Sequence, residues 1–142
     1  MLNEREKIEA LLDATRARSG ARGAVLLDLE GRPVTRGWPG VKVEVLAALA
    51  AASFASTREV GKVVSDQPVS GLRIECGTDC FQVWRVGQDH LVAAFYSVKE
   101  TAQDSVALHF GQSLASLDTL AGRLPPRAEG EGFICSNRFP DV

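Results

Sequence analysis

The centre of the chain carries an apolar run that has no polar face. From Val45 to Ala52 every residue is apolar, and five of these eight residues are alanine. Alanine has the highest helix propensity of all residues, so the run predicts a helix over residues 41–59. A helix on the surface of a monomer shows one apolar stripe and one polar face. Because this helix has no polar face over its middle turns, we expect the chain's own sheet to cover one side and a second copy of the chain to cover the other.

The beginning of this segment also fits a strand. Residues 41–45 alternate between valine and charged residues, which is the period of a strand. The unbroken continuation into the alanines favours a helix. Glu44 supports that interpretation, because a carboxylate is stabilised near the positive end of a helix dipole.

Two further helices are predicted, over residues 4–19 and 101–124. Apolar residues recur in both at the spacing of one buried helical face. Each begins with a capping-box pair, in which a polar residue precedes an acidic one by three positions. These pairs are Asn3 with Glu6 and Thr101 with Asp104. Pro125 ends the last helix, because proline cannot continue a helix.

Five stretches have the composition of strands. Residues 24–27 and 90–96 are continuously apolar, which is typical of strands covered on both faces. Residues 72–76 alternate between apolar and charged side chains, as in a half-exposed strand. Pro33 favours an edge position for its strand, because it lacks the N–H that a ladder needs. The predicted strands are residues 24–27, 32–36, 72–76, 80–86 and 90–96.

The element order is therefore α-β-β-α-β-β-β-α. It predicts an α/β (α+β) fold, a three-layer sandwich built on one five-stranded, mainly antiparallel sheet. We expect the central helix on one face and the two terminal helices on the other. Residues 1–124 are expected to form one domain, followed by a Pro/Gly-containing C-terminal tail at residues 125–142.

This pattern resembles the Roadblock/dynein light-chain family over residues 3–124. The resemblance lies in the element order, in the segment GAVLLDLEGRPV at residues 23–34 with its Asp-x-x-Gly turn, and in the small-residue central helix followed by three strands. It implies a scaffold that binds and regulates a small Ras-like GTPase, as the bacterial gliding-motility members do, without catalysis or a cofactor of its own. The alternative is a GTPase-independent interaction or sensory module in a larger signalling or motor complex.

The resemblance also implies a homodimer. Its central helices would pack together, and its third strands would pair edge to edge into one continuous sheet. In this sequence the implied interface consists of Leu46, Leu49, Ala50, Ser53, Phe54, Leu72, Arg73 and Ile74.

Composition narrows the classes of partner. The net charge of −2 and the pI of about 5.7 give no basic surface for nucleic acid. No apolar run approaches the roughly 20 residues that a membrane-spanning helix needs. Three cysteines and the absence of a recognisable export signal predict a cytoplasmic location.

Motifs for chemistry are weak. Gly61-Lys62 is followed by Val63, and Ser56 stands where a phosphate loop has its first glycine, so we expect a regulator of a GTPase rather than a GTPase. Cys76 and Cys80 flank a short turn. They are interpreted as a redox pair or, preferably, as small apolar residues at a sheet edge. We expect no metal and no cofactor.

Several side chains are candidates for contact with a partner. Trp38 has two interpretations, as an anchor for a partner or as a cap on the end of the sheet. Three apolar residues in the tail would dock on a GTPase or on the chain's own helices: Phe133, Ile134 and Phe139. Four arginines at strand positions are candidates for stabilising charge in GTP hydrolysis, but ordinary surface roles are preferred and no catalytic role is assigned: Arg32, Arg36, Arg73 and Arg85.

Overall fold

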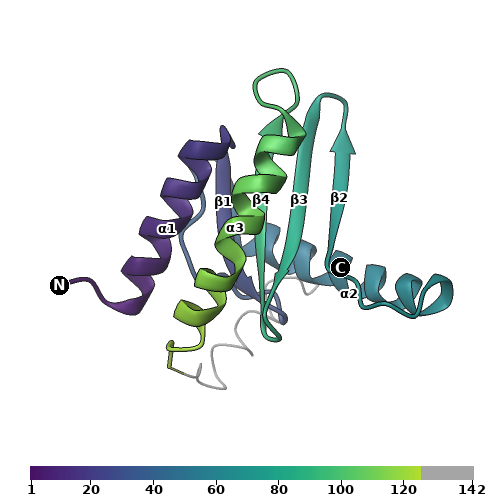
Figure 1. The fold of residues 1–142 in the computed structure, drawn as a ribbon, viewed down its shortest axis with the longest axis horizontal. Helices are drawn as coiled ribbons and strands as arrows, with labels where there is room; N and C mark the ends of the chain where they lie inside the picture. Colours follow the sequence, from purple (N-terminus) through teal and green to yellow (C-terminus); the bar gives the residue numbers. More distant parts are fainter. Residues whose placement is uncertain (126–142) are drawn as a thin grey trace.

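The computed structural model describes residues 1–125. Within them three helices accompany four strands, and the strands form one antiparallel sheet in the order β1-β4-β3-β2 (Figure 1). The elements are α1 (Glu4–Ser19), β1 (Gly23–Asp28), α2 (Val43–Val64), β2 (Gly71–Cys76), β3 (Asp79–Val86), β4 (His90–Ser97) and α3 (Gln103–Ala121). The boundary expected at residue 124 and the tail beyond it stay predictions, because residues 126–142 lie outside the described part of the chain.

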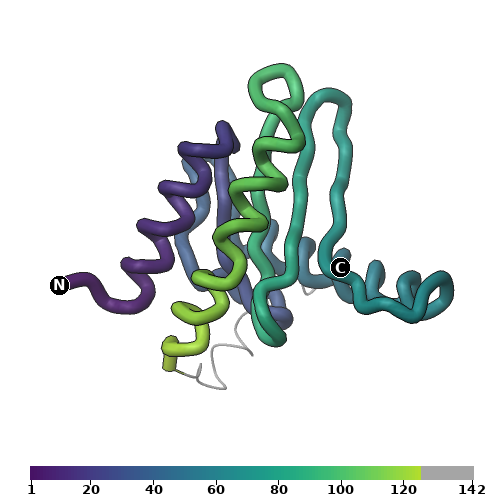
Figure 2. The backbone as a smooth tube through the Cα atoms, in the orientation of Figure 1, coloured from purple at the N-terminus to yellow at the C-terminus, as the bar shows by residue number. Residues whose placement is uncertain are grey.

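The molecule has three layers, as the sequence predicts. Figures 1 and 2 show α1 and α3 side by side on one face of the sheet and α2 crossing the other face. Each face has its own apolar core. The first core contains Ile8 of α1 and Phe110 of α3, and the second contains Phe54 of α2. Strand β4 contributes to both cores and has a neighbour on each side, which confirms that its continuous apolar run marks a central strand.

The prediction of a fifth strand at residues 32–36 is wrong. This segment makes one isolated bridge, between Leu27 and Pro33, and no ladder. Pro33 lacks an N–H, so the pairing cannot extend through it. The segment nevertheless covers the outer edge of β1, since the Val34 N–H donates to the Leu26 carbonyl at 2.8 Å and the Thr35 hydroxyl oxygen accepts from the Leu26 N–H at 2.9 Å.

The ends of the helices agree with the prediction in one case and differ in two. The Asn3 side chain accepts from the Glu6 N–H at 2.8 Å and caps α1, as expected. The capping box predicted at Thr101 is wrong. Helix α3 begins at Gln103, and the Thr101 hydroxyl donates instead to the Ser19 carbonyl at 2.6 Å. Helix α2 continues to Val64, beyond the predicted range of residues 41–59; residues 62–64, whose sequence fits either the tail of this helix or a brief extended segment, are its last residues.

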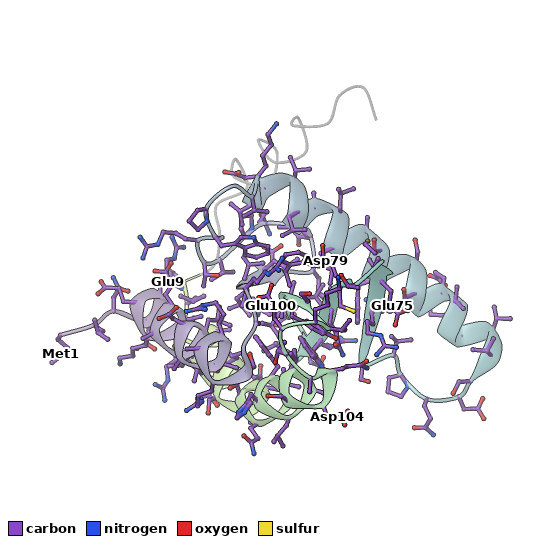
Figure 3. The ribbon with its side chains drawn as sticks, turned by 90° about the horizontal axis from the view of Figure 1, so that it is seen from above. Met1, Glu9, Glu75, Asp79, Glu100 and Asp104 are labelled. Carbon is purple, nitrogen blue, oxygen red and sulfur yellow. The ribbon has the colours of Figure 1, made fainter. Side chains whose placement is uncertain are left out.

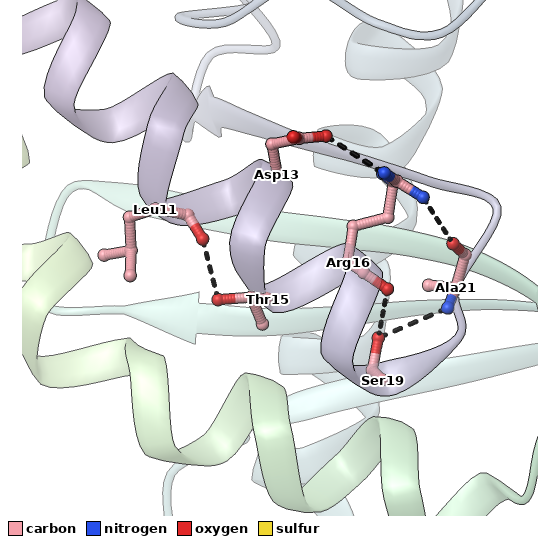
Figure 4. Close-up of polar contacts among 6 residues, drawn as sticks. All are labelled: Leu11, Asp13, Thr15, Arg16, Ser19 and Ala21. Carbon is pink, nitrogen blue, oxygen red and sulfur yellow. Dashed lines mark hydrogen bonds and ion pairs between the residues drawn. The ribbon is translucent and has the colours of Figure 1, made fainter.

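Hydrogen bonds fix the end of α1 and join it to α3. Figure 4 shows the Ser19 hydroxyl donating to the Arg16 carbonyl at 3.0 Å and accepting from the Ala21 N–H at 3.3 Å. One turn earlier, the buried hydroxyl oxygens of Thr15 and Ser113 lie 2.7 Å apart across the α1–α3 contact. The two helices are thereby held as one layer, and α2 is left as the only helix on the opposite face within residues 1–125.

Replacing Phe54 by alanine tests the packing of α2 on the sheet. Phe54 is 1% exposed, and truncating a buried phenylalanine lowers the free energy of unfolding by about 3–5 kcal/mol. Leu108→Ala is the matched control, because Leu108 of α3 is 55% exposed and its loss should change stability by no more than about 0.5 kcal/mol. Urea denaturation at one protein concentration measures both, and equal losses would contradict this packing.

Candidate functional site: the outer side of α2 and the free edge of the sheet

Helix α2 buries one side and leaves its other sides exposed. Ala47, Ala51 and Phe54 face the sheet. On the opposite side Leu49 is 56% exposed and Val63 is 85% exposed. Because successive residues of a helix rotate by about 100°, one outward stripe contains Val45, Leu49, Ala52, Ser56, Val60 and Val63. This stripe carries no charge and has no cover within residues 1–125.

Two residues of the predicted interface belong to the core instead. Ala50 and Phe54 are buried against the chain's own sheet, so they do not line the exposed surface. The helix is apolar on all sides over its middle turns, and its sequence therefore could not indicate which side faces the sheet. Leu46 and Ser53 are half-buried and Leu49 is exposed, so these predicted residues do lie at the surface.

The C-terminal part of α2 extends beyond the sheet. In Figure 1 the helix crosses behind β3 and β2 and then continues past β2. The chain returns beneath this end through residues 65–70. Gly61 permits the return, because a Cβ at Gly61 would lie 2.5 Å from Cγ2 of Val69. Val60 and Val64 on this overhanging end are exposed.

Strand β2 is the free edge of the sheet. The Arg85 N–H donates to the Ser70 carbonyl at 2.9 Å just before the strand begins. Since residues of an antiparallel strand alternate between bonding one neighbour and the other, the backbone groups of Arg73 and Glu75 point to the open side. Their side chains form an ion pair at 3.1 Å. The strand therefore presents an unpaired ladder edge within the described residues.

An apolar row runs across the sheet beside α2. The strand register aligns Gly23, Phe95, Phe81 and Ile74 from β1 to β2. Trp38 lies over Gly23 and stacks on Phe95 with ring centroids 6.1 Å apart. Ile74 at the β2 end is 39% exposed, and the aromatic side chains are half-buried. We call Trp38, Phe95, Phe81 and Ile74 the aromatic row.

Charged residues border this row at the end of the sheet seen in Figure 3. The Arg22 guanidinium lies 5.8 Å from the Phe95 ring centroid and forms ion pairs with Glu100 and, at 3.8 Å, with Asp79. The hydrogen bond from Arg22 lowers the pKa of Glu100. The aromatic row is therefore bordered by charged side chains that form ion pairs with one another.

The two candidate cysteines lie on the β2–β3 hairpin. In the β2–β3 register Cys76 is opposite Asp79, while Cys80 is opposite Glu75. The two cysteines are therefore not paired across the hairpin. Cys76 is exposed and Cys80 is buried, which argues against a redox pair.

Each candidate arginine already has a partner within the chain. Arg32 bonds Asp28 at 2.8 Å and also pairs with Glu30. Arg36 bonds Glu9 at 3.1 Å, and Arg85 donates to two backbone carbonyls. Arg73 pairs with Glu75, as described above. Phe133, Ile134 and Phe139 lie outside the described residues.

Residues 1–125 contain neither a cluster of metal-ligating side chains nor a helix that could cross a membrane. No three side chains of histidine, cysteine, aspartate or glutamate gather there in a way that would hold a metal ion. None of the described helices is both long enough and apolar enough to cross a membrane.

Fold and surface together define a small α+β domain that has, within residues 1–125, an open sheet edge and an exposed apolar helix face. The chain belongs to the Roadblock/LC7 domain family, whose model matches residues 7–95. This confirms the resemblance seen in the sequence. A comparison with curated proteins found no match.

Solved structures share the fold at low sequence identity. The gliding protein MglB from Thermus thermophilus is 19% identical with a TM-score of 0.78, and the match covers 87% of this chain and 95% of that one. MglB from Myxococcus xanthus is 19% identical with a TM-score of 0.75, covering 83% and 97%. A Roadblock/LC7 domain from Streptomyces avermitilis is 19% identical with a TM-score of 0.73, covering 80% and 96%.

Replacing Gly23 by alanine tests the aromatic row. A Cβ at Gly23 would lie 2.2 Å from Cδ2 of Trp38, so the indole must leave its place on Phe95. We expect a red-shifted tryptophan emission and a loss of near-UV circular dichroism. Gly111→Ala is the control, because a Cβ at Gly111 meets nothing within 4 Å and an alanine suits a helix interior. Unchanged spectra in the Gly23 variant would contradict the stacking.

Proposed function

We propose that this protein is a homodimeric scaffold that binds and regulates a small Ras-like GTPase and performs no catalysis itself. One observation carries the proposal: α2 is apolar on sides that its own sheet does not reach, and it extends past an unpaired edge strand. Membership of the Roadblock/LC7 domain family supports the same assignment.

The second copy is proposed to cover one flank of α2. On the other flank the helix meets the turn after β1, where a Cβ on Gly31 would lie 2.8 Å from the Cα of Ala48. Leu46, Ser53 and Val64 project away from Ala48, since successive residues rotate by about 100°. Their flank faces the aromatic row and the β2 edge. Pairing two β2 edges would bring the overhanging end of each α2 over the sheet of its partner.

The outermost side of α2 is proposed to bind the GTPase. Val45, Ala52 and Val63 lie on the stripe directed away from the sheet, so a partner helix on the flank would leave them exposed. Two such stripes on one dimer would form a continuous apolar surface. Apolar patches of this kind mark sites of protein association. The family resemblance is the reason for proposing a GTPase as the partner that binds this stripe. The sequence around Gly61-Lys62 does not form a phosphate loop, which fits a regulator of a GTPase rather than a GTPase.

Replacing Leu49 by aspartate tests the dimer, because Leu49 lies on the border between the outward stripe and the flank formed by Leu46 and Ser53, where a partner helix would cover it. A charge buried at a dry interface without a partner costs several kcal/mol, so the variant should sediment as a monomer where the natural chain sediments as a dimer. Leu108→Asp is the matched control, because Leu108 is 55% and Leu49 56% exposed in the single chain and Leu108 lies on the opposite layer. A natural chain that stays monomeric at high micromolar concentration would refute the proposed dimer.

Replacing Ala52 by glutamate separates GTPase binding from dimerisation. The change places a charge on the outward stripe, so it should abolish the effect on GTP hydrolysis while leaving the sedimentation coefficient unchanged. Ala107→Glu on the exposed side of α3 is the control. The measurement uses a small Ras-like GTPase from the same genome, loaded with GTP or GDP. Absence of binding in both nucleotide states would favour the GTPase-independent interaction module instead.

A further inference from the structure

The family resemblance implies that two β2 edges pair in the dimer. We propose that this pairing takes a single register, with Ile74 on the two-fold axis, and that Arg73 and Glu75 select the register by pairing with each other across the interface. The inference rests on the proposed homodimer and specifies which edge residues make the chain recognise its own copy.

Symmetry limits the possible registers. An antiparallel pair of identical edge strands has its two-fold axis perpendicular to the sheet, so both copies keep the same face toward α2. Residues directly opposite in such a pair carry their side chains on the same face. Ile74 is opposite Phe81 and shares the α2 face with it, whereas Arg73 is opposite Gln82 on the α1–α3 face. Arg73 therefore cannot lie opposite Ile74, and the axis must pass through a residue.

The backbone gives the same restriction independently. Because the Ser70 carbonyl accepts from the Arg85 N–H, alternation directs the N–H and C=O groups of Arg73 and Glu75 to the open edge. New hydrogen bonds across the interface must therefore join these residues to residues of the partner's β2 whose backbone groups also point to the open edge. With the axis at Ile74, Arg73 and Glu75 of the partner form such a hydrogen-bonded pair twice. Ile74 then occupies the close, non-hydrogen-bonded position on the axis.

Charge decides among the registers that remain. An axis at Arg73 would place two arginines opposite each other, and an axis at Glu75 would place two carboxylates opposite each other. Like charges directly opposite are destabilising, while opposite charges are favourable. An axis at Leu72 would move Arg73 opposite Gly71 and shorten the overlap of the six-residue strands. Only the axis at Ile74 joins the existing 3.1 Å Arg73–Glu75 pairs of the two copies into a closed ring of alternating charge.

The same register also joins the apolar surfaces. Ile74 is the β2 end of the aromatic row. When it lies on the axis, the row of one copy continues directly into the row of the other. An axis at Arg73 or Glu75 would offset the two rows. A neutral, self-complementary Arg-Ile-Glu triplet therefore favours a second copy of this chain over an edge strand that lacks the same spacing.

Cysteine cross-linking tests the register in the full chain. Single variants Arg73→Cys, Ile74→Cys and Glu75→Cys are made in a background with Cys76→Ser, Cys80→Ala and Cys135→Ser, and are oxidised with copper phenanthroline. Ile74→Cys should cross-link on the order of tenfold faster than either neighbour, because only the axial position brings two equivalent Cβ atoms within disulfide reach. The background protein itself should not cross-link. Faster cross-linking at position 73 or 75, or none at any position, would overturn the register.

Charge exchange provides a second readout. Arg73→Glu and Glu75→Arg should each weaken dimerisation by about tenfold in Kd, which corresponds to the modest energies of cross-strand charge pairs acting twice. The double variant should recover the dissociation constant of the natural chain. Failure of the single variants to weaken the dimer, or of the double variant to recover it, would contradict the charge selection. Circular dichroism checks that each variant is folded.

Sedimentation of the reduced natural chain separates the two levels of the proposal. A dimer that cross-links at the wrong position refutes the register and leaves the proposed homodimer standing. A monomer refutes both.

Discussion

Helix α2 is longer than the width of the sheet that it crosses, so its C-terminal end extends beyond the sheet and is exposed. Its 22 residues span about 33 Å at the usual rise per residue. Four strands at their usual spacing make a sheet only about 19 Å wide. The N-terminal part of the helix buries Ala47, Ala51 and Phe54 on the sheet, while the C-terminal part extends beyond β2 with Val60 and Val64 exposed. A chain with α1 and α3 committed to the other face has no described element left to cover this end.

The sequence predicted the layers because both faces of the sheet carry clear patterns. Buried positions carry apolar residues, so the continuous apolar run of β4 and the helical spacing of Ile8 and Leu12 indicated directly which residues are buried. The fifth strand failed for a different reason. Residues 32–36 lie beside β1 as a strand would, but Pro33 interrupts the ladder and the Thr35 side chain replaces a backbone acceptor. The predicted cap at Thr101 failed because a tertiary bond to Ser19 competed with the local one.

The candidate site was only partly visible in the sequence. An all-apolar helix indicates a need for cover on several sides, but its sequence does not show which residues face the sheet, so the burial of Ala50 and Phe54 on the chain's own sheet could not be predicted. The aromatic row was missed entirely. Its members come from three strands and a loop, and only the register brings them into line. The one local signal was Gly23, whose missing side chain makes room for Trp38.

The two edges of the sheet differ: the β1 edge is covered by a segment of the chain, and the β2 edge is open within residues 1–125. The outer edge of β1 is closed by residues 32–36, which satisfy both backbone groups of Leu26. Natural proteins protect exposed edges with proline, lysine, bulges or covering segments. Within residues 1–125, strand β2 has no proline, lysine, bulge or covering segment, since it reads Gly-Leu-Arg-Ile-Glu-Cys with a regular ladder to β3. Its only charges are one of each sign, and they flank Ile74 symmetrically. The proposed dimer pairs this open edge with its counterpart in a second copy, and the proposed register depends on the order of these two charges.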